Sequence, residues 1–296
     1  MSISVVIPTK NRLLTLSRAL DSVTAQTLAP DEIIVVDDGS DDDTPQFLAE
    51  RAAMDGRIIV LRNENSTGAQ NARNSGAQKA TGATIGFLDS DDYWHPDKLR
   101  LQSALLDAHP GAPAAFCNTR YLHRDRPARI SHIAPIVSKT DLYGHNVLGG
   151  TSGVLVRRQA FADVGGFAPD MPYVEDWDLW LRLADIAPLR VVPDVLVDYH
   201  FDGGGQLSSN RSGMEAGHRR LFASVNRLIT DAAELRRVRA KQERKMAEFY
   251  ARKCHDLPAS LRALWKSARI DPSLPSLTAS VQTLAKSAAI VSLRRH

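Results

Sequence analysis

The sequence contains only two cysteines, Cys117 and Cys254, and they lie far apart in the chain. This spacing provides neither a disulfide framework nor the paired thiols of a zinc site, so we expect a reducing compartment. Nowhere does the sequence contain about eighteen consecutive apolar residues, the length that a transmembrane helix needs. The first residues also lack the basic region and apolar stretch of a secretory signal. Together these absences predict a cytoplasmic protein.

Two ligand-binding motifs are also missing. No Gly-x-Gly-x-x-Gly sequence follows the first predicted strand, so a dinucleotide-binding fold is unsupported. The acidic segments lack the internal glycine and the distal glutamate of an EF-hand loop. What remains is an ordinary globular composition of 43% hydrophobic and 24% charged residues, in a chain of 296 residues that can bury a sizeable core.

Positive charge is unevenly distributed along the chain. Residues 211–296 contain 18 basic and 7 acidic residues, whereas residues 1–210 contain 19 basic and 27 acidic residues. An acidic body with a basic end suggests contact between that end and an anionic surface, such as a phospholipid membrane or an acidic partner. A solvated helical face is the alternative explanation for the same charges.

Apolar runs of strand length alternate with helical spacings through the first ninety residues. Strands are predicted at 3–8, 32–36, 57–61 and 83–88, and helices at 13–27, from 44 onward and at 68–80. This alternation predicts an α/β fold with a parallel, doubly wound sheet. Residues 210–296 predict a basic, mostly helical extension. We therefore expect one domain at 1–209 and a second at 210–296.

Two of the predicted strands end in carboxylates. Asp37 and Asp38 close the second strand, and Asp89, Asp91 and Asp92 close the fourth. Carboxylates this close raise each other's pKa unless a cation neutralises them. Magnesium and manganese often share one or two carboxylates with substrate phosphates, and open α/β sheets bind ligands at the carboxyl ends of their strands. The pattern indicates a nucleotide and metal site. Hydrogen-bonded or solvated turns are the simpler alternatives.

Four segments, in this order, resemble family 2 inverting glycosyltransferases with the GT-A fold: Ser4-Val5-Val6-Ile7-Pro8-Thr9-Lys10-Asn11-Arg12, Ile34-Val35-Val36-Asp37-Asp38-Gly39-Ser40, Gly68 through Ala72-Arg73-Asn74-Ser75-Gly76, and Phe87-Leu88-Asp89-Ser90-Asp91-Asp92. Four segments in one order are more specific than any one of them. The resemblance implies a Rossmann-like, mostly parallel sheet flanked by helices. It also implies a nucleotide-diphosphate sugar donor, most often UDP-linked, and a magnesium or manganese ion.

The resemblance assigns roles to individual residues around the donor. It implies that Pro8, Thr9 and Arg12 line the nucleotide pocket, that Asp38 contacts the nucleoside, and that Arg73 lies near the base or phosphates. Asp89, Ser90 and Asp91 match the family's Asp-x-Asp motif, and Asp91 is the stronger candidate for direct metal contact. Many relatives have Tyr-Arg-x-His near residues 199–202, where this chain has Tyr199-His200-Phe201-Asp202. Either His200 or Asp202 could complete the metal site, or neither.

A further acidic pair marks the start of a predicted helix at Glu175 and Asp176. Negative charge is favourable at a helix N-terminus, so these residues have a structural explanation. The resemblance implies that Asp176 is the general base, with Glu175 beside it in the acceptor site. Gly150 and Thr151 would border the acceptor, although a turn is equally consistent with them. Trp177 could stack on a sugar, and packing in the core is the alternative.

The sequence therefore predicts a metal-dependent inverting glycosyltransferase of polysaccharide or glycolipid synthesis. Its expected partners are a nucleotide-sugar donor and a glycan or lipid-linked acceptor, with no nucleic acid. The basic end could bring it to the inner face of a membrane. One alternative is a sugar nucleotidyltransferase, which would more typically show a basic glycine-rich loop after the first strand. Another is a non-catalytic subunit that binds nucleotide sugars.

Overall fold

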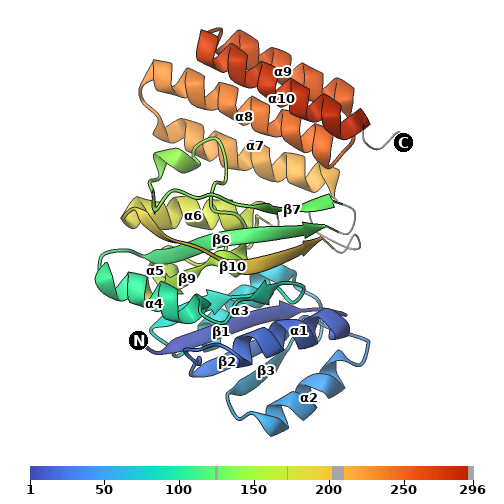
Figure 1. Cartoon of the computed structure of the whole chain (residues 1–296), viewed down its shortest axis with the longest axis vertical. Helices are drawn as coiled ribbons and strands as arrows, with labels where there is room; N and C mark the ends of the chain where they lie inside the picture. Colours follow the sequence, from blue (N-terminus) through green and yellow to red (C-terminus); the bar gives the residue numbers. More distant parts are fainter. Residues whose placement is uncertain (124–125, 172, 202–209, 293–296) are drawn as a thin grey trace. The chain divides into compact units, whose positions relative to one another are not determined.

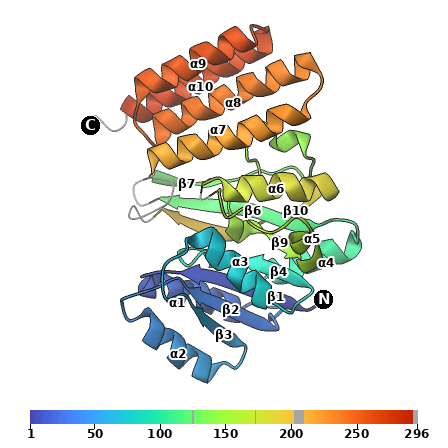
Figure 2. The same cartoon turned by 180° about the vertical axis from the view of Figure 1, so that it is seen from behind.

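The structure is a computed structural model that describes residues 1–123, 126–171, 173–201 and 210–292 (Figures 1 and 2). The chain divides into two compact units. The first unit comprises Met1–Lys139 and Val147–Gly203, and the second comprises Thr140–Asn146 and Gly204–His296. No helix among the described residues is long and apolar enough to cross a membrane.

The first unit is a mixed α/β structure, which confirms the predicted fold class. Its strands are β1 (Ile3–Thr9), β2 (Glu32–Asp37), β3 (Ile58–Arg62), β4 (Thr84–Phe87), β5 (Tyr93–Trp94), β6 (Ala114–His123), β7 (Arg126–Ile130), β8 (Ile136–Val137), β9 (Leu155–Arg157) and β10 (Leu189–Phe201). Its helices are α1 (Leu13–Thr24), α2 (Thr44–Met54), α3 (Ala69–Lys79), α4 (Lys98–Ala108), α5 (Arg158–Asp163) and α6 (Glu175–Ile186), with a 3₁₀ turn at Thr151–Gly153.

The main strands of the sheet run in one direction, and β9 is the antiparallel strand between β4 and β6. The strand order is β3-β2-β1-β4-β9-β6-β10-β5, with β7 beside β6 and β8 beside β10. Strands β3, β2, β1 and β4 are parallel to one another, as the alternation of strands and helices predicts. Strand β9 joins these four strands to β6. The carboxyl ends of β1, β2 and β4 therefore lie at one edge of the sheet.

Helices cover both faces of the parallel region. Alternate residues of β1 point to opposite faces, so Ile3, Val5 and Ile7 belong to a buried cluster with the apolar side chains of α1 and α4. On the other face, α3 approaches closely because Gly76 has no side chain. A Cβ at Gly76 would lie 2.4 Å from a methyl carbon of Val6. Figure 1 shows α1 and α4 in front of the sheet, and Figure 2 shows α3 and α6 on the opposite side.

The second unit is helical over its described residues. It contains α7 (Arg211–Leu228), α8 (Ala232–Arg252), α9 (Leu257–Ile270) and α10 (Leu274–Ser292), with a 3₁₀ turn at Thr140–Leu142. Asn210, Asp231 and Asp256 cap the first three of these helices, because each side chain accepts a hydrogen bond from a backbone N–H in the first turn. The predicted helical extension is therefore present.

Candidate active site

The Asp38 carboxylate anchors the loop that joins β3 to α3. It accepts hydrogen bonds from Asn63 Nδ2 (2.8 Å), Ser66 Oγ (2.7 Å), Thr67 Oγ1 (2.9 Å) and the backbone N–H groups of Thr67 (2.9 Å) and Gly68 (2.9 Å). Burial alone would raise the pKa of Asp38, but these donors hold it at about 2. The residue expected to contact the nucleoside thus has a structural role in shaping loop 63–68.

The neighbouring Asp37 is also held by protein donors. Its carboxylate accepts hydrogen bonds from the backbone N–H of Ser40 (2.9 Å) and from Arg62 Nη1 (3.1 Å). The side chain is buried at the end of β2. This first acidic pair is therefore the hydrogen-bonded turn that was the simpler explanation of its sequence.

The second acidic cluster, Asp89 to Asp92, is arranged around the turn at Thr151–Gly153. Thr151 Oγ1 donates to the Asp89 carboxylate at 3.1 Å. Ser152 Oγ accepts from the Asp89 backbone N–H at 3.1 Å and donates to Asp92 Oδ2 at 2.5 Å. Burial raises the pKa of Asp92 well above its ordinary value, and the charges of Asp89 and Asp91 raise it further. Unlike Asp38, Asp92 is buried beside two further carboxylates, Asp89 and Asp91.

A buried arginine connects the acidic cluster to α6. Arg73 Nη2 lies 2.6 Å from Asp89 Oδ1, and Arg73 Nη1 lies 3.1 Å from Glu175 Oε1. Burial would lower the pKa of Arg73, but the charges of Asp89 and Glu175 raise it, so the guanidinium stays ionised. Its Nε is buried without a hydrogen-bond partner among the described residues. Arg73 therefore places Glu175 and Asp89 in one ionic network.

Asp176 follows a strained residue at the start of α6. Val174 has φ 58° and ψ 24°, a left-handed conformation that is unfavourable for a β-branched side chain. Strain of this kind concentrates at functional sites. Burial and the neighbouring charge of Glu175 raise the pKa of Asp176 to about 7, against the effects of the Trp177 N–H and Arg73. A carboxyl with this pKa can exchange a proton near neutral pH.

Three residues that the sequence did not mark hold the Thr151–Gly153 turn from the core side. Trp94 Nε1 donates to the Ser152 carbonyl (2.8 Å), and Gln102 Nε2 donates to the Gly153 carbonyl (2.8 Å). Lys98 Nζ donates to Gln102 Oε1 (2.8 Å) and is fully buried, which lowers its pKa to about 8. A lysine is almost never fully buried, and no sequence motif marked this one.

Two tyrosines from β6 and β10 also belong to this site and were not predicted. The ring centroids of Tyr121 and Tyr199 lie 5.7 Å apart. Burial raises the pKa of Tyr199, and the charges of Asp92 and Asp89 raise it further. Burial likewise raises the pKa of Tyr121, which Arg129 lowers and Asp176 raises. Both phenols thus lie within electrostatic reach of the carboxylates, and no sequence motif marked them.

The expected metal ligands are only partly brought together. Asp91 lies beside Arg12, with Oδ2 3.8 Å from Nη1, and its side chain is 22% exposed. The backbone N–H of His200 donates to Asp92 Oδ1 at 3.3 Å, so His200 lies beside the cluster. Asp202 lies outside the described residues. Within those residues, no group of three or more His, Cys, Asp or Glu side chains is arranged to hold a metal ion.

The remaining candidates occupy different environments. Pro8 and Thr9 are at the end of β1, where Thr9 Oγ1 is buried without a hydrogen-bond partner among the described residues. Ser90 is buried in the acidic cluster. A Cβ at Gly150 would meet no atom within 4 Å, so this position borders open space. Trp177 is only 2% exposed. This burial agrees with packing in the core, the alternative to stacking on an acceptor sugar.

Comparisons with known proteins identify the family that this chain resembles. The model of glycosyl transferase family 2 matches residues 4–165. Over 104 residues, covering 35% of this chain and 40% of the relative, the chain is 40% identical to the UDP-Glc:alpha-D-GlcNAc-diphosphoundecaprenol beta-1,3-glucosyltransferase WfgD of Escherichia coli. Across three curated relatives, the matched segment spans 61%, 25% and 40% of the relative's length.

Solved glycosyltransferases have the same fold. S. aureus TarS 1-349 in complex with UDP-GlcNAc matches with a TM-score of 0.70 and 20% identity, over 100% of this chain and 92% of that one. The mannosyltransferase PcManGT of Pyrobaculum calidifontis, in complex with GDP-Man and Mn²⁺, matches with a TM-score of 0.64 and 20% identity, over 99% and 84%. These matches confirm the GT-A type of fold.

Proposed function

Because the chain belongs to glycosyl transferase family 2, we propose that it moves a sugar from a nucleotide-diphosphate sugar to an acceptor hydroxyl, with inversion at the anomeric carbon. One observation carries this proposal. Asp176 lies beside a strained residue and has a pKa raised to about 7, in one charge network with Glu175, Arg73 and Asp89. The strongest signs of a reactive carboxylate therefore occur where the family places its base.

Asp176 acts as the general base in this reaction. Its ionised carboxylate takes the proton of the acceptor hydroxyl while the hydroxyl oxygen attacks the anomeric carbon. The bond between that carbon and the diphosphate oxygen breaks, and the electron pair leaves with the nucleoside diphosphate. Because attack comes from the side opposite the leaving group, the configuration inverts. Burial of Asp176 favours this role, since a pKa near 7 combines basicity with partial ionisation at neutral pH.

The donor binds at the shared edge of β1, β2 and β4. Thr9 and loop 63–68, which Asp38 holds in shape, border the nucleoside, and Arg12 and Arg73 bring positive charge toward the diphosphate. We favour a UDP-linked donor, which the UDP-GlcNAc complex of TarS supports. A GDP-linked donor is the alternative to test, because PcManGT was solved with GDP-Man. Sugar identity depends on contacts that no motif encodes.

The acidic cluster fits a divalent cation that shares its coordination with the donor phosphates. Asp91 is partly exposed, whereas both oxygens of Asp89 already accept hydrogen bonds from Thr151. One or two protein carboxylates suit magnesium or manganese, which retain several non-protein ligands. Asp91 would hold the ion, with Asp89 and either His200 or Asp202 as further candidates. When bound, the ion would stabilise the charge of the departing diphosphate.

The acceptor reaches Asp176 from the side that Gly150, Thr151 and Glu175 border. We propose a glycan or lipid-linked acceptor in cell-surface polysaccharide or glycolipid synthesis, at the cytoplasmic face of a membrane. The name of the E. coli relative, which specifies a diphosphoundecaprenol-linked acceptor, supports this class. Tyr121 and Tyr199 are further candidates for contact with the acceptor, because both are in the field of the catalytic carboxylates.

Calorimetry with UDP- and GDP-sugars, with and without manganese, tests the donor site first. We expect manganese-dependent binding of a nucleotide sugar. Turnover with candidate acceptors, followed by NMR of the new linkage, then tests inversion. Binding without turnover on any acceptor would favour the non-catalytic subunit. Formation of a nucleotide sugar from a sugar phosphate and a nucleoside triphosphate would favour the nucleotidyltransferase.

A further inference from the structure

The last two helices expose several large apolar side chains. On α9, Leu261 and Trp265 are exposed, Trp265 by 59%. On α10, Leu277, Val281 and Leu284 are exposed, Val281 by 65%. The residues of each helix recur at intervals of three or four, so they form one stripe on each helix. We call these two stripes, taken together, the α9–α10 outer face.

The opposite sides of the same helices are mostly small and polar, with Leu264 as the one large buried apolar residue among those described. The buried residues of α9 include Ala259, Ser260, Ala263 and Ser267, and the buried residues of α10 include Ser276, Ser280 and Thr283. Ser267 Oγ donates to the Ala240 carbonyl (3.0 Å), and Arg244 Nη1 donates to Ser267 Oγ (3.0 Å) and Ser276 Oγ (2.9 Å). An amphipathic helix of a globular unit normally buries most of its large apolar residues, whereas α9 buries Leu264 and exposes Leu261 and Trp265.

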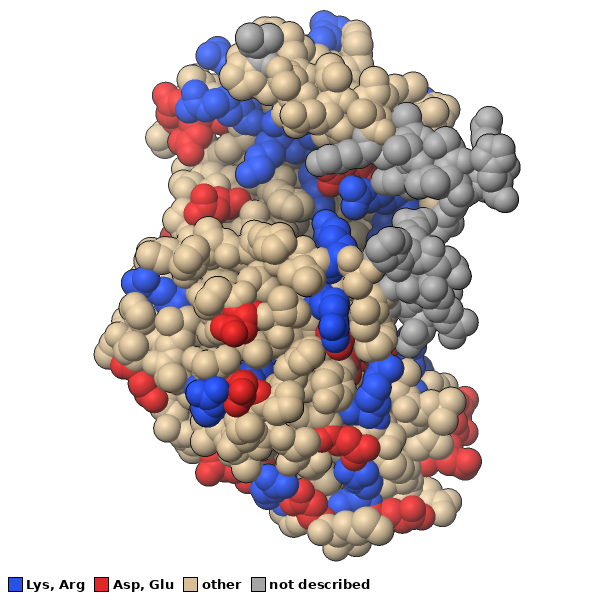
Figure 3. All heavy atoms as spheres, in the orientation of Figure 1, with Lys and Arg blue, Asp and Glu red and all other residues tan. Residues whose placement is uncertain are grey.

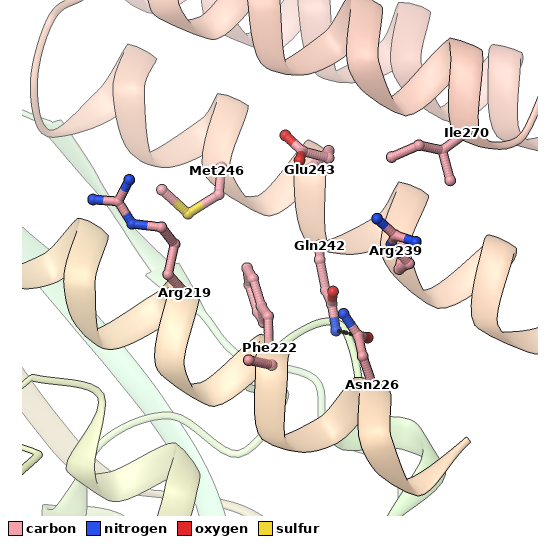
Figure 4. Close-up of a pocket in the computed structure, with 9 residues that line it drawn as sticks. Arg219, Phe222, Asn226, Arg239, Gln242, Glu243, Met246 and Ile270 are labelled. Carbon is pink, nitrogen blue, oxygen red and sulfur yellow. Dashed lines mark hydrogen bonds between the residues drawn. The ribbon is translucent and has the colours of Figure 1, made fainter. Parts of the chain in front are cut away.

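Other contacts in the same unit follow the usual rule. The space between α7, α8 and the end of α9 is a cavity of about 250 Å³, and Phe222, Met246 and Ile270 line it (Figure 4). Phe249 is buried nearby on α8, and its ring lies 5.9 Å from that of the buried His218. The helices α7 and α8 of the same unit therefore bury large apolar side chains, and the exposed stripes are specific to α9 and α10.

Charge indicates what covers the outer face. Arg262, Lys266 and Arg269 are exposed on α9, and the Arg269 guanidinium lies 4.5 Å from the centre of the Trp265 ring. Residues 257–296 contain six basic residues and a single acidic one, Asp271. In Figure 3 the surface over α9 and α10 is mostly uncharged, with separate basic groups. A second copy of this face would bring like charges together, which is unfavourable.

We propose that the α9–α10 outer face binds the surface of an anionic phospholipid bilayer, with both helices lying in the plane of the interface. Apolar side chains on one face of a helix enter the boundary between headgroups and acyl chains, and lysine and arginine bind the anionic headgroups. Tryptophan is favoured at this depth because its ring is amphipathic. The proposal rests on the second unit alone and does not depend on the proposed activity.

Sedimentation of the full chain with vesicles tests this proposal. We expect binding to vesicles of equimolar phosphatidylglycerol and phosphatidylcholine, weaker binding at high salt, and little binding to phosphatidylcholine alone. The variant R262E/K266E/R269E should lose about a hundredfold in partitioning, since each basic group near the surface contributes about fivefold. W265S/V281S should also bind more weakly. M54S, which changes a side chain 82% exposed on α2, is the matched control and should bind as the unmodified chain does.

Tryptophan fluorescence gives a second measurement at the site itself. Of the four tryptophans, Trp94, Trp177 and Trp180 are buried, so a blue shift on adding vesicles would come from Trp265. The shift should disappear in W265F. Failure to bind anionic vesicles, or unchanged binding by R262E/K266E/R269E, would overturn the proposal. So would a dimer in analytical ultracentrifugation that W265S/V281S dissociates, because a second copy would then cover the face.

Discussion

Two strands of the same sheet end in carboxylates, and the structure treats them in opposite ways. After β2, Asp38 receives five hydrogen bonds from loop 63–68, and its pKa falls to about 2. After β4, Asp92 is buried among charges of the same sign, and its pKa rises. The two carboxylates differ both in the hydrogen-bond donors around them and in the like charges beside them. The carboxylate with many donors and a low pKa holds the frame of the site, and the carboxylates with raised pKa values are the candidates for chemistry.

The largest effect is expected when a carboxylate with a raised pKa is removed. Asp176→Asn should lower kcat by about 10³-fold, because the amide cannot take the acceptor proton. Donor affinity by calorimetry should stay within about twofold, since Asp176 acts on the acceptor.

The matched control is Asp178→Asn in the same helix. Asp178 pairs with Arg182 on α6, at 2.6 Å, so its replacement removes a carboxylate of the helix without touching the proton transfer. Its kcat should stay within about fivefold, as expected for a partly exposed ion pair. Lost donor binding by Asp176→Asn, with normal turnover of what binds, would contradict the role as base.

The second effect tests the structural role of Asp38. Asp38→Asn should lower the free energy of unfolding by about 3 kcal/mol, because the amide nitrogen faces donors that the carboxylate satisfied. Asp91→Asn is the control, since its side chain is 22% exposed, and it should weaken binding of the metal and donor with little change in stability. Urea denaturation measures both variants.

The lowered pKa of Asp38 predicts that the protein loses stability at acidic pH. The folded pKa of Asp38 is below its ordinary value of 3.8, so its contribution is fully present above that value and is lost as the pH falls through about 2. Asp38→Asn should flatten the acid limb of the stability curve. An unchanged acid limb would show that the loop does not depend on this carboxylate.

The third effect concerns the pH dependence of turnover. Because the pKa of Asp176 is about 7, the base is increasingly protonated below that pH. We expect kcat to fall about tenfold for each further pH unit on the acidic side. Stopped assays in buffers of constant ionic strength measure this slope. A flat profile down to an ordinary aspartate pKa would mean that Asp176 is not desolvated during turnover.

Much of this organisation could be predicted from the sequence. The β-branched runs and the acidic residues after them located the strand ends of the site, because burial and turn chemistry are local properties. The distinction between Asp38 and Asp92 could not be predicted, since it depends on donors from loop 63–68 in one case and on Ser152 in the other. These partners lie 28 and 60 residues away in sequence.

Residues that break the usual burial rules were also missed. Lys98 is a lysine with no exposed surface, and the stripe that Leu277 and Val281 form on α10 points outward. In both cases tertiary packing overrides the preference of the individual residue. For Trp177 the sequence left stacking on a sugar and packing in the core as alternatives, and its burial on α6 agrees with packing.

The smallest expected effects compare the two acidic sites through one matched substitution. Ser66 Oγ donates to Asp38 Oδ2 at 2.7 Å, and Ser152 Oγ donates to Asp92 Oδ2 at 2.5 Å, so Ser→Ala removes one hydroxyl–carboxylate bond at each site. After Ser66→Ala, four other donors still hold Asp38, so the free energy of unfolding should fall by less than about 0.5 kcal/mol with little change in kcat/KM.

Ser152→Ala should have a different outcome because this hydroxyl has two partners. It also accepts from the Asp89 backbone N–H, so its loss releases both ends of the acidic cluster. We expect a loss of about 1 kcal/mol in stability and about tenfold in kcat/KM for the donor. Denaturation and initial-rate measurements on both variants decide the point. Equal kinetic losses from the two substitutions would mean that loop 63–68 is as much a part of the reactive site as the Asp89–Asp92 cluster.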